Sequence, residues 1–377
     1  MIGSLAIELK NDVLRKSNDA VSIQEHQKSA INWLKRAHDM GNDGGVSYGY
    51  YLRGKPFSAF GLGWRSSYIE TSGYIVDTFF DIAKRYHDDD CALRAEQIGR
   101  WLLTIQNSDG SFSNARYAIS KGIVFDTGQV LFGLIRCYQE TQDVQFLEAA
   151  QKASSWLAKK TDNDGAWRQN THQDSLHTYN TRTAWAMLEC CRILPDADVE
   201  RAARKNLNWA LSHQMRNGLF ENCSFKTGLD PFTHTIAYAV RGLYEGGLIL
   251  QDERFIAAAK KAAICMAEYV DESGFLPGRI SATGQPHNGS ACLTGNCQMA
   301  IIWYKIGKAF DDHSLIETAN LALDFVLSTQ NIHTKNENIR GAIKGSHPIW
   351  GKYTPMAYPN WATKFQIDAL LLREEIS

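Results

Sequence analysis

Residues 100–112 read Arg-Trp-Leu-Leu-Thr-Ile-Gln-Asn-Ser-Asp-Gly-Ser-Phe, and the outline of this stretch recurs along the chain. A similar Trp-containing pair stands 55 residues later at Trp156 and another 53 residues later at Trp209. Nine residues after each Trp comes a Gly-X-aromatic turn, whose glycines are Gly110, Gly165 and Gly218, with weaker copies at Gly44 and Gly274. A period of this length is typical of a repeat architecture. We expect each glycine to end a helix, because glycine adopts the left-handed conformation at little cost.

A second helix is expected after each of these loops. Segments such as Thr235–Gly242 and Gln298–Lys305 are apolar on nearly every side, which is typical of a buried helix. The helices before the loops, such as Gln145–Lys159 and Arg254–Tyr269, carry charge on one face only. Their expected N-caps are Asp90, Asp143, Asp198, Asp252 and Asp312.

Six amphipathic helices therefore alternate with six apolar helices, and strand patterns are nearly absent. A closed ring buries the apolar helices inside the amphipathic ones, whereas an open solenoid needs polar caps at its ends. The last apolar helix, Asn360–Leu372, has no such cap. We predict an all-α fold, an (α/α)6 toroid of six outer/inner helical hairpins over residues 24–377, preceded by an N-terminal extension of residues 1–23.

Composition excludes several classes of protein. The chain has 377 residues, and its 40 basic and 41 acidic side chains give a net charge of −1, which argues against a nucleic-acid partner. The longest apolar runs, such as Ala300–Tyr304, are far shorter than the roughly 20 residues of a membrane span. Met1–Lys10 lacks a secretory pattern. Most of the eight cysteines fall in apolar helical patterns, which favours reduced thiols and a cytoplasmic location.

The chain resembles the six-hairpin glycosidases and, more loosely, the terpenoid-cyclase and prenyltransferase toroids. It is also similar to toroid proteins associated with bacterial polysaccharide assembly. The resemblance covers about residues 24–373 and is carried by the hairpin repeat, the Asp-Gly-Ser-Phe loop at 109–112 and the polar starts of the inner helices. It implies the toroid fold, and because this fold hosts many reactions, the chemistry must be argued from the site.

The loop side of such a ring gathers the N-termini of all inner helices, so their polar first residues should meet at one cavity. The helix starts supply Glu70, Asp126, Gln129, His177, Tyr179, Asn180, Arg182, His234, Asn296, Trp361 and Lys364, and the loops add Trp64, Arg65, Trp167, Glu221, His287, His347 and Trp350. Carboxylates, amides, imidazoles and indole rings in one place are typical of a sugar site. Arg65, Arg182 and Lys364 would suit a carboxylated sugar.

The preferred function is a glycoside hydrolase that acts on an acidic, uronic-acid-type oligosaccharide. Asp126 would donate the proton and Glu70 would activate water or stabilise positive charge. The two residues are 56 positions apart, about one repeat, which places them on neighbouring inner helices. The unsaturated glucuronyl hydrolases, which this scheme resembles, place acids on successive inner-helix starts. Simple helix capping stays open for both, because Asp126–Gln129 and Ser67–Glu70 have capping-box spacing.

Three alternatives stay open. A polysaccharide lyase or uronyl C5-epimerase would move the C5 proton with His234, His177 or Tyr179. An isoprenoid-handling toroid would have an apolar cavity, and a non-catalytic glycan-binding or assembly protein would bind sugar without turnover. No cofactor is expected, and no metal either: the spacing of Cys292 and Cys297 is not that of a zinc pair. The acidic run at 87–90 is expected to be a solvated connection with a helix cap.

Overall fold

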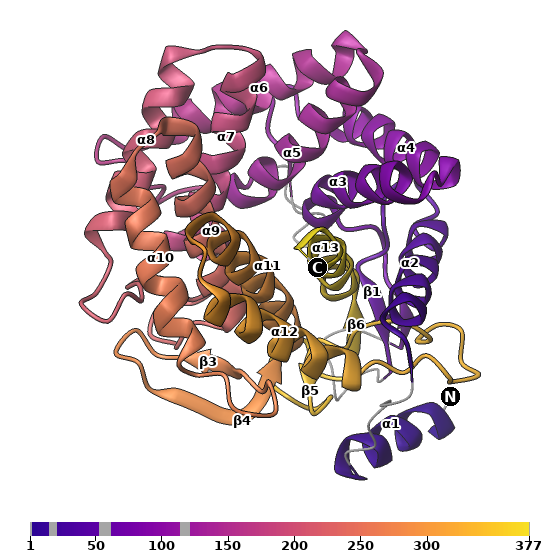
Figure 1. Cartoon of the computed structure of the whole chain (residues 1–377). Coiled ribbons are helices and arrows are strands. Elements are labelled where there is room, and N and C mark those ends of the chain that lie inside the picture. The colour runs from indigo at the N-terminus through magenta and orange to yellow at the C-terminus, as the bar shows by residue number, and fades with distance from the viewer. Residues whose placement is uncertain (1, 15–20, 53–61, 114–120, 377) are drawn as a thin grey trace.

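The computed structural model describes residues 2–14, 21–52, 62–113 and 121–376, and the fold is all-α apart from six short strands. The outer helices are α2 (Ile23–Asp39), α4 (Asp89–Ile105), α6 (Val144–Lys160), α8 (Ala197–Ser212), α10 (Glu253–Ala267) and α12 (His313–Ser328). The inner helices are α3 (Ile69–Tyr86), α5 (Val124–Thr141), α7 (Thr181–Ile193), α9 (Thr233–Leu250), α11 (Leu293–Phe310) and α13 (Asn360–Ile376). A further helix, α1 (Ile2–Leu14), lies outside the ring (Figure 1).

The inner helices form a closed ring. Each contacts the next in chain order, and α13 contacts both α11 and α3, so the last repeat meets the first (Figure 1). The predicted (α/α)6 toroid is confirmed, and the open solenoid is excluded.

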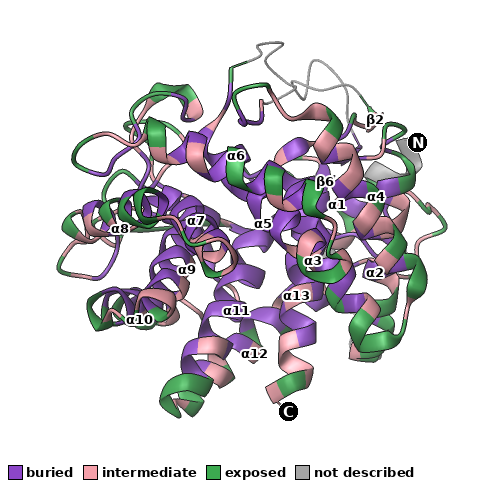
Figure 2. Cartoon of the chain, turned by 90° about the horizontal axis from the view of Figure 1, so that it is seen from above, coloured by how far each residue is buried: buried purple, intermediate pink, exposed green. Residues whose placement is uncertain are grey.

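Burial follows the sequence pattern. Every residue from Leu293 to Tyr304 of α11 is buried, whereas α2 buries one face and exposes the other (Figure 2). The inner ring is therefore the hydrophobic core, and the outer helices separate it from solvent.

The repeated glycines join neighbouring repeats. Gly165 has a φ of +95°, and a Cβ on it would lie 2.3 Å from the backbone oxygen of Lys205 in the next outer helix, α8. Gly341 makes the same kind of approach to the carbonyl oxygen of Ser29 in α2, so this contact also closes the ring. The prediction that the glycine ends a helix is wrong, because α4 and α6 end five residues before Gly110 and Gly165.

Aspartate caps begin five of the outer helices, and two of them differ from the prediction. The capping residues are Asp88, Asp143, Asp196, Asp252 and Asp312. Asp90 and Asp198, which we expected in this role, lie inside the first turn and pair with Arg94 and Arg201. The acidic run at 87–90 contains a helix cap, as expected, but only His87 and Asp88 connect the two helices, because Asp89 and Asp90 belong to the first turn of α4.

Two small antiparallel sheets lie among the loops that precede the inner helices. The first has the order β2-β1-β6, and the second has the order β3-β4-β5. The strands are β1 (Gly49–Tyr51), β2 (Gly63–Trp64), β3 (Pro277–Ile280), β4 (Pro286–Cys292), β5 (Ser346–His347) and β6 (Ala357–Pro359). Since β4 leads directly into α11 and β6 into α13, these sheets fix where both inner helices begin.

Among the described helices, none is both long and apolar enough to cross a membrane. Within the same residues, no three His, Cys, Asp or Glu side chains are grouped so that they could hold a metal ion. All eight cysteines are free, and seven of them are buried.

Candidate active site

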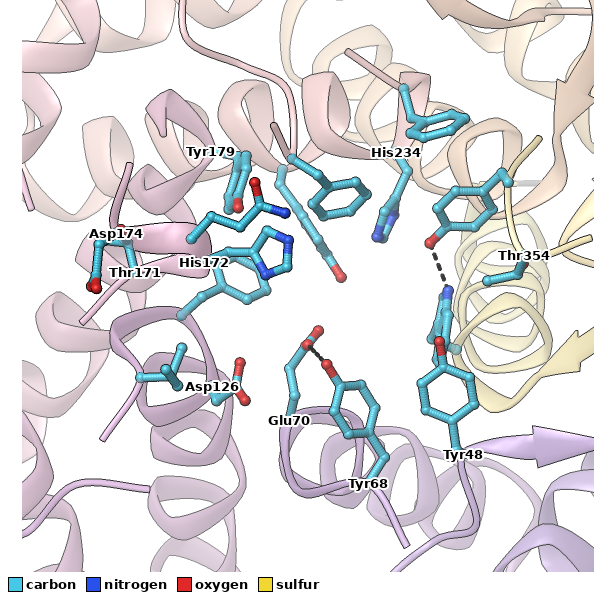
Figure 3. A pocket seen from close by; sticks show the side chains of 18 of the residues that line it. Tyr48, Tyr68, Glu70, Asp126, Thr171, His172, Asp174, Tyr179, His234 and Thr354 are labelled. Atoms are coloured by element: carbon cyan, nitrogen blue, oxygen red, sulfur yellow. Dashed lines mark hydrogen bonds between the residues drawn. The ribbon is translucent and has the colours of Figure 1, made fainter. Parts of the chain in front are cut away.

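A cavity of about 590 Å³ opens where the inner helices begin. Of its twenty lining residues, nine are Phe, Tyr or Trp, so flat rings form much of its wall. Such walls suit the faces of pyranose rings, provided that polar groups also converge there. Figure 3 shows polar groups of this kind, which come from α3, α5 and α9 and from the loops that precede the inner helices, including those before α7 and α13.

Two carboxylates meet in this cavity. Glu70 is the second residue of α3 and Asp126 is the third of α5, and both side chains point into the open space (Figure 3). Tyr68 donates its hydroxyl hydrogen to Glu70 Oε2 over 2.6 Å. Asp126 is 3% exposed. Both acids therefore lie on adjacent helices of the inner ring, as their spacing of one repeat predicts.

Neither acid acts as a helix cap. The N-cap residues of α3 and α5 are Tyr68 and Ile123, and neither makes a side-chain capping bond. Gln129 makes no capping-box bond, because its Oε1 accepts a 2.6 Å hydrogen bond from Arg182 Nε, while its Nε2 donates to the carbonyl oxygen of Phe125 over 3.4 Å. The capping-box interpretation of both pairs is wrong.

His234 and Tyr179 also line the cavity, but their environments limit their acid–base chemistry. Burial, assisted by the charge of Arg182, lowers the pKa of His234 to about 3 against an opposing hydrogen bond to Gln298. Burial, followed by the negative charge of Glu70, raises the pKa of Tyr179 well above its ordinary value. Near neutral pH, His234 is therefore a neutral and weak base, and Tyr179 keeps its proton.

His177 lies behind Tyr179 and does not line the cavity. The two rings stack with centroids 4.5 Å apart and an interplanar angle of 19°. The ring nitrogens of His177 lie 3.0 Å from the carbonyl oxygen of Ser224 and 2.8 Å from that of His172. Burial lowers the pKa of His177. The imidazole that reaches the cavity from this loop is His172, which was not among the residues predicted from the sequence.

Trp361 is the fifth predicted residue that lines the cavity. Its Nε1 donates a 2.8 Å hydrogen bond to the hydroxyl of Tyr353, and its ring meets that of Tyr48 edge-on at 4.6 Å. Tyr48 and Tyr353 belong to the same wall and were not predicted.

Three predicted tryptophans lie outside the cavity. Trp64 packs 5.4 Å from Trp33 and donates to Asn338 Oδ1. Trp167 is buried beneath α6, where its Nε1 donates to the carbonyl oxygen of Leu157. Trp350 is 44% exposed.

Four predicted polar residues of the inner-helix starts and of the loops also lie outside the cavity. Glu221 is exposed in its loop. Asn180 and Asn296 are fully enclosed, and their amide atoms have no hydrogen-bond partner among the residues that the structure describes. Gln129 is buried against Arg182.

The two histidines predicted from the loops differ in their contacts: His287 pairs with Asp230, whereas His347 lies close to Asp12.

The cations predicted to bind a sugar carboxylate lie elsewhere. Lys364 pairs with Asp368, and with Arg182 it lines a separate cavity of about 670 Å³ bounded by residues farther along the inner helices. Arg182 also lies over the rings of Tyr238 and Tyr74, at 5.0 and 5.7 Å from their centroids. Arg65 lies over Tyr51, with 5.0 Å between its guanidinium carbon and the ring centroid.

Two other cations line the candidate site. Lys121 pairs with Asp174 over 2.9 Å, and Lys352 is exposed. The cavity therefore combines three carboxylates, two lysines and an aromatic wall, and Asp174 is the carboxylate that pairs with Lys121.

Comparison with known proteins gives one family model and several solved structures that are similar to this chain. The sequence model of the ulvan lyase N-terminal domain matches residues 121–294. An unsaturated glucuronyl hydrolase from Bacillus sp. GL1 superposes with a TM-score of 0.72 at 13% identity, over 94% of this chain and 97% of that one. A heparin-specific unsaturated glucuronyl hydrolase gives 0.69 at 16% identity, over 93% and 96% of the two chains.

A third solved structure shows the breadth of chemistry on this architecture. Cellobiose 2-epimerase from Bacillus thermoamylovorans B4167 superposes with a TM-score of 0.69 at 12% identity, over 99% of this chain and 100% of that one. A search of curated proteins gives no match. The chain has the (α/α)6 toroid fold of these enzymes. At such low identity the likeness shows the fold and not the reaction.

Proposed function

We propose that the protein is a glycoside hydrolase that acts on acidic, uronic-acid-type oligosaccharides. The observation that carries this proposal is the convergence of Glu70 and Asp126 from adjacent inner helices into one aromatic-walled cavity. Two carboxylates across a sugar linkage are the groups that most glycosidases use. The likeness to unsaturated glucuronyl hydrolases supports this substrate class.

Asp126 is the proton donor in this proposal, and Glu70 activates water or stabilises the positive charge that develops on the sugar. Asp126 is buried in the wall of the cavity and stands in the first turn of α5. Glu70 accepts the hydrogen bond from Tyr68, which orients its carboxylate toward the cavity. The opposite assignment of the two roles gives the same reaction, and the variants below distinguish the two.

Recognition of the acidic group is assigned to the lysines at the cavity. Lys352 is exposed there, and Lys121 lines the same cavity and is paired with Asp174. A flexible ammonium suits a carboxylate or sulfate on a sugar, because its charge attracts either group without a fixed planar geometry.

Elimination by a lyase is the second candidate, because the ulvan lyase N-terminal model matches part of the chain. Tyr179 and His234 would then move the C5 proton. Their shifted pKa values disfavour it, since His234 is a weak base and Tyr179 holds its proton tightly. An isoprenoid substrate suits the site less well, because the carboxylates and lysines make the cavity polar.

We also propose a cytoplasmic location. Eight free cysteines, seven of them buried, suit a reducing compartment.

One assay separates these functions. The enzyme is incubated with an oligosaccharide that ends in an unsaturated uronic acid, and with the intact acidic polymer. We expect the ultraviolet absorbance of the conjugated unsaturated acid to fall and new reducing ends to form from the oligosaccharide. A rise in absorbance on the polymer would instead establish elimination, and binding without either change would establish a non-catalytic protein.

Two variants then test the residues. Asp126→Asn and Glu70→Gln are each expected to lower kcat by about 10³-fold or more, since each removes one half of the acid/base pair. A nucleophile added in excess should restore turnover only to the variant that lacks the base. Full activity in both variants would contradict the proposed site.

A further inference from the structure

Helix α1 buries two carboxylates against residues 344–358, a segment that forms one wall of the cavity. Glu8 and Asp12 are four residues apart and therefore lie on the same face of α1. They are 2% and 6% exposed, although charged side chains are rarely buried without partners.

Asp12 bonds to the beginning of this segment. Its Oδ1 accepts from Lys344 Nζ in a buried ion pair, and its Oδ2 accepts from the backbone N–H of Ile349 over 2.7 Å. The Nδ1 of His347 lies 3.3 Å from the same carboxylate. One carboxylate thus joins three positions within six residues of chain.

Glu8 bonds to the far end of the same region. Its Oε2 accepts from the hydroxyl of Tyr358 over 2.7 Å, and its Oε1 accepts from Asn331 Nδ2 over 2.6 Å. Together, Glu8 and Asp12 therefore hold the segment on both sides of residues 350–357.

The held segment is strained and lines the cavity. Thr354 and Met356 have φ values of +43° and +57°, which are costly for residues other than glycine and persist only where the surroundings enforce them. Lys352, Tyr353 and Thr354 line the cavity, and the ring of Tyr353 lies 5.2 Å from that of His234. The shape of the cavity on this side consequently depends on the conformation of residues 350–357.

We propose that α1 is a positioning element of the active site, in which Asp12 and Glu8 hold residues 346–357 in the conformation that presents Lys352, Tyr353 and Thr354 to the substrate. The role of this segment in substrate binding rests on the proposed function. The positioning itself is a property of the fold and can be measured without any substrate.

The test compares Asp12→Asn with Glu245→Gln. The amide that Asp12→Asn introduces cannot accept from both Lys344 and the Ile349 N–H as the carboxylate does, because an amide has only one acceptor oxygen. Glu245 is a matched control, because it is a largely buried carboxylate that bonds Arg241 and Lys305 within α9 and α11, away from this segment. Both variants should lose thermal stability.

Only Asp12→Asn is expected to accelerate hydrogen exchange in residues 346–357, by about ten-fold or more. On an unsaturated uronyl oligosaccharide it should raise KM several-fold with little change in kcat. Equal exchange in the two variants, or an unchanged KM in Asp12→Asn, would overturn the inference. If wild-type protein hydrolyses no acidic oligosaccharide, the proposed function fails, whereas the exchange measurement still decides whether α1 positions the segment.

Discussion

Tyr68 caps α3 by position and, over 2.6 Å, donates a hydrogen bond to Glu70 only two residues ahead. The start of α3 therefore determines the positions of both the carboxylate and the hydroxyl that orients it. We expect Tyr68→Phe to lower kcat/KM by about ten- to a hundred-fold, because a hydrogen bond to a charged group contributes about 1.5–3 kcal/mol. Steady-state kinetics measure this effect.

The control for this variant is Tyr86→Phe, since Tyr86 also donates to a glutamate, Glu374, at 3.1 Å, but on the exposed surface. Equal kinetics in Tyr68→Phe and wild type would show that Glu70 does not depend on this bond.

Lys352→Met is expected to raise KM for an acidic oligosaccharide by about ten-fold, because it removes a charge worth roughly 1–2 kcal/mol against a carboxylate. Lys226→Met is the matched control, since Lys226 is exposed but does not line the cavity. The assignment of acid recognition to Lys352 is wrong if both variants bind the substrate as wild type does in calorimetry.

Gly165→Ala should destabilise the fold more than Gly228→Ala. Both glycines have positive φ, +95° and +81°, so alanine costs about 1–2 kcal/mol at either. Only at Gly165 does the new Cβ meet a backbone atom, at 2.3 Å, whereas Gly228 has open space around it. Chemical denaturation should show a further loss of about 1–3 kcal/mol for Gly165→Ala. Identical free energies of unfolding would refute the packing role of the loop glycine.

Acid should destabilise the protein partly through His234. The unfolded chain binds a proton at this residue below its ordinary pKa of 6.5, whereas burial lowers the folded-state pKa to about 3. Stability is therefore lost as pH falls between these values, by up to about 1.4 kcal/mol per pH unit from one group. His26, His38 and His177 have lowered pKa values as well and contribute in the same direction.

We expect His234→Asn to show a shallower fall in unfolding free energy between about pH 6.5 and pH 4 than wild type. The Asn amide can still donate to Gln298, so stability near neutral pH serves as the internal reference. Parallel pH curves for the two proteins would mean that His234 is protonated in the folded state.

The repeat and the closure of the ring could be predicted from the sequence, because both follow from local periodicity and from the need to bury six apolar helices. The placement of Glu70 and Asp126 on adjacent inner helices could be predicted from the same repeat. Which way a side chain points depends on the rotation of its helix, and no periodicity fixes that. Gln129 is one turn after Asp126 yet faces Arg182, and Lys364 lies one turn beyond the start of α13, away from the cavity.

The loop residues of the wall were beyond prediction for a different reason. Lys352 and Tyr353 stand in a segment without periodic pattern, and contacts with α1, more than 300 positions away, determine its course. A similar limit applies to the helix caps: two aspartates compete for the start of α4, and only the packed structure selects Asp88 over Asp90.

The contact between Gly341 and Ser29 has a consequence for how the protein is made. A nascent chain leaves the ribosome from its amino end. The apolar surface of the first hairpin that packs against the last hairpin therefore stays exposed until the last hairpin has been synthesised. Contacts of such long range are reached slowly. We expect truncated translation products to recruit chaperones and to aggregate, and the complete chain to become protease-resistant in one late step.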